Sequence, residues 1–164
     1  MKYVSIAASL VLFSLASLGY SQPDAQKVLQ SQYDRISMLS IKKDKVKLEK
    51  MIRKNASSEF EYIDSMKNSL DLAATVRQNT EQLNGVYKFN SNENKIIGMK
   101  RIGDVYVCTI KTTYDVFADY KKKNRIQGVS LSQDTWIKTI SGWKIRKSQI
   151  LKATATNNGK PIKI

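Results

Sequence analysis

The sequence predicts a domain of the α+β class, with helices in the first half of the chain and antiparallel strands in the second. Apolar residues recur at helical spacing between residues 23 and 55. After Gly85 they alternate with polar residues, as is typical of strands with one buried face. A hairpin over residues 134–145 is the strongest single feature, because it contains both tryptophans of the chain. This order of elements favours helices packed on one face of a curved sheet.

The N-terminus has the pattern of a secretory signal peptide. Lys2 precedes an uncharged apolar run from Val4 to Leu18, and small residues follow at Gly19 and Ser21. The run is shorter than the roughly 20 residues that a membrane span needs. Cleavage after Ser21 is favoured over cleavage after Gly19, and an uncleaved anchor is the alternative. We therefore expect an exported protein, periplasmic or extracellular, without a transmembrane segment in its mature chain.

Two helices are predicted at the start of the mature chain. The first contains Pro23 in its first turn, with Ser21 as a candidate cap. Its apolar stripe consists of Val28, Leu29, Tyr33, Ile36 and Leu39. Asp44 is placed to cap a second, shorter helix. The inward face of that helix would consist of Leu48, Met51 and Ile52.

A short strand and a third helix are predicted next. Residues 59–63 alternate as a strand does, and residues 69–83 are interpreted as a helix that ends at Gly85. Four strands complete the domain, over residues 95–102, 105–117, 129–140 and 143–151. The turns between them fall at Gly103-Asp104, 121–124 and Ser141-Gly142.

The domain organisation follows from these elements. We expect a signal peptide over residues 1–21, a single domain over 22–156 and a loose C-terminal tail over 157–164. About 140 residues are enough for one domain with a substantial core.

In the hairpin, a two-residue Ser141-Gly142 turn would pair Ile140 with Trp143, Lys138 with Ile145 and Trp136 with Lys147. One face would then be core, with Trp136, Ile140, Trp143 and Ile145. The other would be mostly polar and basic, with Thr135, Ile137, Thr139, Lys144, Arg146 and Ser148. Asp134 lies on the same face as Trp136 and could face the interior. Lys138 also falls on that face, which is at odds with its charge.

Composition excludes several kinds of site. The chain has no histidine and one cysteine, so histidine-dependent triads and zinc sites built on imidazole or several thiolates are excluded. Cys108 lies in a strongly apolar strand and is interpreted as a small buried core residue. The sequence has neither a glycine-rich phosphate loop nor an acidic calcium loop. We expect no metal and no cofactor, and any catalysis would depend on Asp, Glu, Tyr, Lys or Arg.

The net charge of +14 is the other strong signal. Basic runs occur at residues 42–43, 121–123 and 144–147. A charge of this size attracts a protein to anionic surfaces, whereas export argues against a nucleic-acid partner. The alternative is a basic, solvated surface without a partner.

The C-terminal strands resemble a known superfamily. Gly103-Asp104 before a long strand, then Asp134-Thr135-Trp136, then Gly142-Trp143-Lys144-Ile145 are similar to the nuclear-transport-factor-2-like (NTF2-like) superfamily, nearest to its bacterial SnoaL-like and ketosteroid-isomerase-like branches. This resemblance implies a cystatin-like cone, in which a strongly curved antiparallel sheet wraps around N-terminal helices and leaves a pocket at its open end. Related domains often dimerise, so we expect a monomer or a homodimer.

The resemblance also implies a chemistry. The ketosteroid-isomerase-like branch uses an Asp base, with a Tyr and a protonated Asp that donate to a developing enolate, and none of these steps needs histidine. The pocket candidates are Tyr33, Tyr114, Asp134 and Trp136. The alternatives are an exposed or capping role for Asp134 and core roles for the tyrosines.

Three functions are consistent with the sequence. The preferred one is an exported, non-catalytic domain that binds a small hydrophobic ligand or a partner in its cone. The second is a carboxylate acid–base enzyme, of the isomerase or dehydratase type, acting on a small hydrophobic substrate. The third is a basic protein that adheres to acidic polymers or lipids. A carboxylate with a raised pKa beside a tyrosine hydroxyl in a pocket would favour the second.

Overall fold

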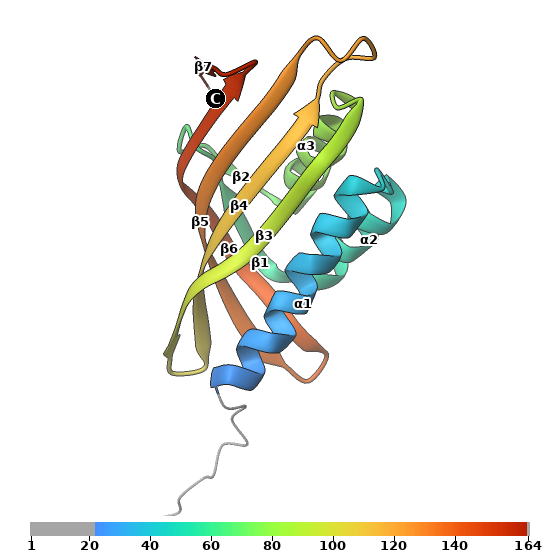
Figure 1. The fold of residues 1–164 in the computed structure, drawn as a ribbon. Coiled ribbons are helices and arrows are strands. Elements are labelled where there is room, and N and C mark those ends of the chain that lie inside the picture. The colour runs from blue at the N-terminus through green and yellow to red at the C-terminus, as the bar shows by residue number, and fades with distance from the viewer. Residues whose placement is uncertain (1–21, 164) are drawn as a thin grey trace, which may run out of the picture.

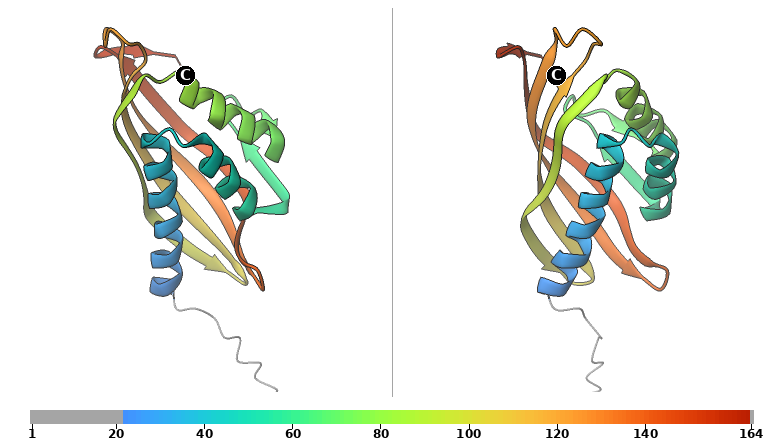
Figure 2. Two further views of the ribbon diagram at one scale, coloured as in Figure 1. Left: turned by 90° about the vertical axis from the view of Figure 1, so that its right-hand side faces the viewer. Right: turned by 45° about the vertical axis from the view of Figure 1, so that its right-hand side comes forward.

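The computed structural model describes residues 22–163, and both views of Figure 2 show its helices on one side of a strongly bent sheet (Figures 1 and 2). The helices are α1 (Gln22–Ile41), α2 (Lys45–Asn55) and α3 (Leu72–Asn84). The strands are β1 (Ala56–Ile63), β2 (Ser69–Leu70), β3 (Lys88–Ile102), β4 (Val105–Phe117), β5 (Arg125–Thr139), β6 (Gly142–Asn157) and β7 (Lys160–Ile162). The predicted signal peptide and the Ser21 cap lie outside the described residues.

The sheet has the order β2-β1-β6-β5-β4-β3, and β7 pairs with β6. All neighbouring strands are antiparallel except β1 and β6, which are parallel. The predicted α+β architecture, with helices against a curved and mostly antiparallel sheet, is confirmed. Within residues 22–163, no helix is long and apolar enough to cross a membrane.

Local signals explain the helix ends. Asp44 caps α2 as predicted, since its side chain accepts a hydrogen bond from the Lys47 backbone N–H. Asp71 caps α3 in the same way through the N–H of Ala74. Gly85 follows α3 as its C-cap, in a right-handed rather than a left-handed conformation.

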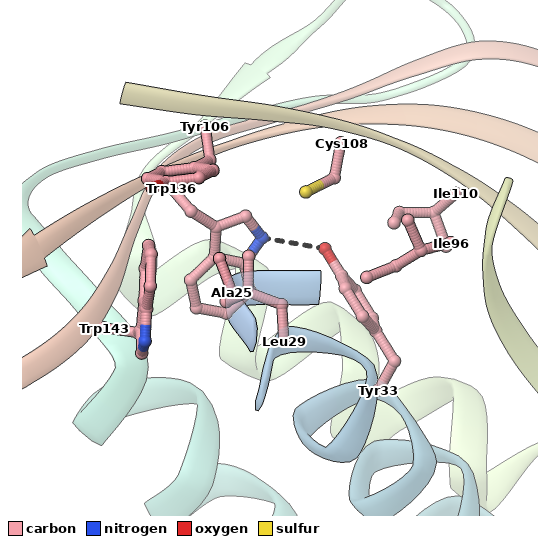
Figure 3. Packing of buried hydrophobic residues seen from close by; sticks show 9 residues of the cluster. All are labelled: Ala25, Leu29, Tyr33, Ile96, Tyr106, Cys108, Ile110, Trp136 and Trp143. Atoms are coloured by element: carbon pink, nitrogen blue, oxygen red, sulfur yellow. Dashed lines mark hydrogen bonds between the residues drawn. The ribbon is translucent and has the colours of Figure 1, made fainter. Parts of the chain in front are cut away.

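The main core lies between α1 and the concave face of the sheet (Figure 3). Leu29 and Tyr33 of α1 pack against side chains of β4 and β5, among them Cys108 and Trp136. Complete burial of a side chain such as Leu29 stabilises the fold by about 2–3 kcal/mol. A second cluster joins the three helices, and it consists of Leu39, Leu48, Met51 and Leu83.

Gln30 fastens α1 to β3, the strand at one end of the sheet. Its side-chain amide donates to the backbone carbonyl of Asn94 at 2.8 Å and accepts from the backbone N–H of Ile96 at 2.9 Å. The side chain thereby replaces part of the missing neighbouring strand. These two bonds attach α1 to the edge of the sheet.

The register predicted for the β5–β6 hairpin is wrong. Thr139 pairs with Gly142, so the two turn residues are Ile140 and Ser141, and Ile140 is fully exposed rather than core. The Thr139 hydroxyl closes this turn by donating to the Gly142 carbonyl at 2.8 Å. Gly142 itself has a φ of +111°, which disfavours other residues.

Trp136 pairs with Ile145, not with Lys147, and Lys138 pairs with Trp143. Both tryptophans are buried, as predicted. Lys138 remains on the inward face but lies at its exposed margin, with its ammonium 5.4 Å from the centre of the Trp143 ring. The charge therefore stays in contact with water.

A β-bulge changes the face of the residues that follow. Thr135 pairs with Lys147 while Trp136 pairs with Ile145, so Arg146 is an extra residue in β6. Ser148 was expected on the polar outer face with Arg146. The bulge turns it inward, where its hydroxyl meets Asp134.

The C-terminal segment also differs from the prediction. β6 continues to Asn157, and Lys160–Ile162 form β7 against it, so residues 157–162 are not a loose tail. Asn158 helps to hold this end, because its side chain donates to the Lys123 carbonyl and its backbone N–H donates to the Arg125 carbonyl. These bonds join two segments that are remote in sequence.

Candidate functional site

One predicted site residue, Asp134, lies in a row that crosses the sheet. Its partners in register are Cys108 on β4 and Ser148 on β6, and Ser148 pairs in turn with Tyr62 on β1. Asp134 and Cys108 are buried, and Tyr62 is partly buried. Helix α1 covers this row with Tyr33.

A closed hydrogen-bond network surrounds the Asp134 carboxyl. Tyr33 donates its hydroxyl to Asp134 Oδ2 at 2.6 Å, and Ser148 donates to Asp134 Oδ1 at 2.7 Å. The indole Nε1 of Trp136 donates to the Tyr33 hydroxyl at 2.8 Å, the dashed line in Figure 3. The Tyr33 hydroxyl thus both donates and accepts within the protein.

Burial dominates the electrostatics of this network. It raises the pKa of Asp134 above its ordinary value, although hydrogen bonds from Tyr33, Ser148 and Ser132 act in the opposite direction. Burial, followed by the charge of Asp134, also raises the pKa of Tyr33 well above 10. The pKa of Cys108 rises to about 12, mainly through burial. Tyr33 and Cys108 are therefore neutral at physiological pH, and Cys108 is a buried core residue, as predicted.

A separate hollow, here called the sheet cavity, lies between the helices and the concave face nearer the C-terminal end of α1. Its volume is about 510 Å³. The apolar part of its wall includes Ile36, Leu48, Leu83, Phe89, Val116 and Ile126. No charged side chain of residues 22–163 lines it.

The polar part of the wall consists of amides and hydroxyls. Five of these side chains make no hydrogen bond within the described residues, and they are Ser40, Gln82, Asn92, Tyr114 and Ser130. Asn94 is committed elsewhere, since it donates to Ser37 and accepts from Thr112. The cavity therefore presents neutral donors and acceptors that a bound molecule could use.

The Tyr114 ring occupies the space that a side chain would take at a glycine on the adjacent strand. Tyr114 pairs with Gly128, and a Cβ built on Gly128 would lie 2.2 Å from Cζ of the tyrosine ring. The ring therefore lies directly over the glycine. Partial burial raises the pKa of Tyr114, so its hydroxyl is a neutral donor and acceptor.

The four predicted site residues fall into two places. Tyr33, Asp134 and Trp136 meet in the buried network, but Tyr114 lines the sheet cavity. Tyr114 is six residues along β4 from Cys108, a separation of about 20 Å in a strand. Convergence of Tyr33, Tyr114 and Asp134 is therefore not observed.

Sequence reasoning missed the polar wall of the sheet cavity. Its residues come from α1, α3, β3, β4 and β5, and no local motif connects them. Gly128 could not serve as a signal, because it lies just before the predicted strand 129–140, and only the structure places it inside β5, where a glycine often marks a close approach of a neighbouring group. Within residues 22–163, no three acidic or thiol side chains gather closely enough to hold a metal ion.

No protein-family model matches the chain, and no curated protein matches its sequence. Solved structures do resemble it. A candidate scytalone dehydratase from Novosphingobium aromaticivorans has a TM-score of 0.68 and 10% identity, over 82% of this chain and 88% of the other. An NTF2-like superfamily protein from Salmonella enterica has a TM-score of 0.61 and 11% identity, over 79% and 92%.

A candidate dehydratase of the NTF2-like family from Streptomyces avermitilis has a TM-score of 0.58 and 11% identity, over 87% of this chain and 99% of the other. At these identities the likeness concerns the fold. The chain has the NTF2-like fold, as its C-terminal strands predicted.

Proposed function

We propose that this chain is an exported, non-catalytic domain that binds a small neutral molecule in its sheet cavity. The ligand would have an apolar body and several hydroxyl, ether or carbonyl groups. The observation that carries this proposal is the uncharged wall, in which five polar side chains lack partners within the described residues. A charged ligand would lose its hydration there without gaining an opposite charge.

Non-catalytic binding is favoured by the position of the titratable groups. General acid–base catalysis requires a proton-transferring group within hydrogen-bond reach of the substrate. Asp134 and Tyr33 do not line the sheet cavity, and their polar atoms are bonded to one another and to Ser148 and Trp136. Tyr114 is the one titratable side chain of the described residues in the wall.

A second candidate function rests on the Asp134–Tyr33 pair itself. A desolvated carboxyl beside a phenol is the arrangement expected for acid–base chemistry, and two solved structures with this fold are candidate dehydratases. For this chemistry a substrate would have to displace Tyr33 from Asp134. The Asp134→Asn variant separates the two functions, because loss of turnover with retained ligand binding would favour the enzyme.

Export is part of the proposal and has its own support in the sequence. Lys2, the following apolar run and the small residues before Gln22 form the pattern of a signal peptide. Expression of the full-length chain, followed by N-terminal sequencing of the exported protein, should give Gln22 as the first residue. An unprocessed N-terminus would contradict this part.

Ligand binding is tested by titrating the exported protein with two probes that share an eight-carbon chain, octyl glucoside below its micelle concentration and octanoate. We expect octyl glucoside to shift the amide resonances of Ser130 and Gln82 saturably, and octanoate to bind more weakly. Gly128→Ala should weaken binding on the order of tenfold, because the new methyl group displaces the Tyr114 ring.

Gly98→Ala is the matched control, since its new Cβ would meet Thr109 only at 3.7 Å, an ordinary contact. Gly98 lies within the edge strand β3, and Gly128 lies within the inner strand β5. Equal losses of affinity in the two variants, or absence of saturable shifts in the cavity wall, would contradict the proposed site.

A further inference from the structure

We propose a second site, in which this protein binds a compact polyanion with two or more phosphate groups. The site is a cleft of about 520 Å³ between α1, α2 and the β5–β6 turn. Four basic side chains line it, and they are Arg35, Lys47, Lys50 and Lys54. This basic cleft shares no lining residue with the sheet cavity.

The spacing on α2 places three lysines on one side of the helix. Lys47, Lys50 and Lys54 are three and four residues apart, so they follow one another along the same face. Arg35 faces them from α1 across the cleft, and all four side chains are exposed. No acidic side chain of the described residues lines the cleft.

Some charged side chains of α2 are neutralised by ion pairs. Glu49 and Arg53 form an ion pair at 2.9 Å, and Lys47 pairs with Asp44 at 2.8 Å. Within residues 22–163, Arg35, Lys50 and Lys54 make no ion pair.

Like charges at these spacings destabilise a helix. Two cations of α2 without an ion pair in the described residues, Lys50 and Lys54, line the cleft together with Arg35 of α1, and an external anion could balance them there.

The shape of the cleft strengthens its field. Met51 and Trp143 are buried apolar residues in its wall, and low-dielectric walls around one sign of charge focus the potential. Lys144 donates a hydrogen bond to the Lys54 carbonyl, which joins the β5–β6 hairpin to the end of α2. Helix and hairpin are thus held together on either side of the site.

The ligand class follows from the donors. The guanidinium of Arg35 can bind a phosphate or carboxylate through two parallel bonds, and the lysines act as point charges. Arg35, Lys50 and Lys54, the three cleft cations without an ion pair in the described residues, match the charge of about two phosphomonoester groups near neutral pH. A single carboxylate would leave most of the cleft charge unbalanced. Paired phosphates occur on free polyphosphorylated molecules and, as singly charged diesters, on lipids such as cardiolipin.

The proposal is tested with tripolyphosphate as the soluble probe and with vesicles of phosphatidylcholine that do or do not contain cardiolipin. The exported protein carries a triple substitution in the cleft, Arg35→Gln, Lys50→Gln and Lys54→Gln. The matched control removes three charges from the β4–β5 loop, through Lys121→Gln, Lys122→Gln and Lys123→Gln. These side chains are all exposed, and thermal unfolding of both variants verifies that they fold.

We expect the cleft variant to lose tripolyphosphate affinity on the order of tenfold or more, and the loop variant to change less than about threefold. In the unmodified protein, the indole N–H resonance of Trp143 should shift during the titration, whereas that of Trp136 should not, since Trp136 is bonded inside the core. Binding should weaken as ionic strength rises.

Two arms distinguish the source of the phosphate. If the cleft substitutions weaken binding to cardiolipin vesicles as much as they weaken binding to tripolyphosphate, the ligand is a lipid headgroup. If the protein binds tripolyphosphate but not the vesicles, the ligand is a free molecule. Equal losses in the cleft and loop variants, or an unchanged Trp143 resonance at saturation, would overturn the site, because binding would then follow net charge alone.

Discussion

At the scale of single residues, one extra position in β6 decides the surroundings of Asp134. The bulge at Arg146 turns Ser148 inward, and its hydroxyl becomes a donor to the buried carboxyl. Tyr33 supplies a second donor from α1. A buried carboxyl with these donors is stable in the core, but its protonation remains coupled to folding.

Asp134→Asn tests that coupling. Burial raises the pKa of Asp134 above 3.8, so the folded protein retains a proton that the unfolded chain releases. Protonation therefore stabilises the folded state fully below pH 3.8. This stabilisation is lost as the pH rises toward the pKa of the folded protein. We expect the difference in free energy of unfolding, wild type minus variant, to fall steadily as pH rises above about 4. Denaturant titrations across this range measure it, and a constant difference would contradict the raised pKa.

At the scale of elements, α3 is the part of the cavity wall that depends most on local capping. It contributes Asn79, Gln82 and Leu83 to the sheet cavity. Its start is set by Asp71, whose side chain binds the Ala74 N–H and whose carbonyl accepts from the Thr75 hydroxyl. Loss of the cap would therefore loosen one wall of the proposed ligand site.

Asp71→Ala should reduce the free energy of unfolding by about 1 kcal/mol, because the N–H of Ala74 loses its partner. Asp71→Ser should retain most of that stability, since a serine hydroxyl caps equally well. Equilibrium denaturation of both variants provides the comparison. If serine and alanine are equally destabilising, the cap is not what positions α3.

At the scale of the whole molecule, the cone has two differently filled ends. Aromatic residues and α1 fill the end at the Gly103 and β5–β6 turns (Figures 1 and 3). The end near α3 has a hollow lined by neutral side chains. The full chain carries a net charge of +14. An excess of this size repels itself in the compact state.

Salt should therefore stabilise the folded protein. We expect the melting temperature to rise between roughly 10 mM and 150 mM sodium chloride, over which the screening length falls from about 30 Å to about 8 Å. Scanning calorimetry measures the change. A melting temperature that falls over this range would show that favourable ion pairs, such as Arg125–Asp115, outweigh the repulsion.

Most of the fold could be predicted from the sequence because its signals are local. The cap at Asp44, the turn at Gly103, the strand from Val105 to Phe117 and the α1 stripe all depend on neighbours within a few residues. The burial of both tryptophans followed from alternation. Of the candidate site, Tyr33 and Asp134 were named as pocket candidates, but their hydrogen bond depends on how α1 packs on the sheet.

By itself, then, the sequence determined the order and type of the main helices and strands but not the short strands β2 and β7, and it determined the absence of histidine chemistry and the excess of positive charge. Only the tertiary structure decided the parallel pairing of β1 with β6, the bulge at Arg146 and the separation of Tyr114 from Asp134. It also brought Arg35 opposite the lysines of α2. The physical reason is that strand register and helix docking are set by packing between residues far apart in the chain, where a shift of one residue reverses which face a side chain occupies.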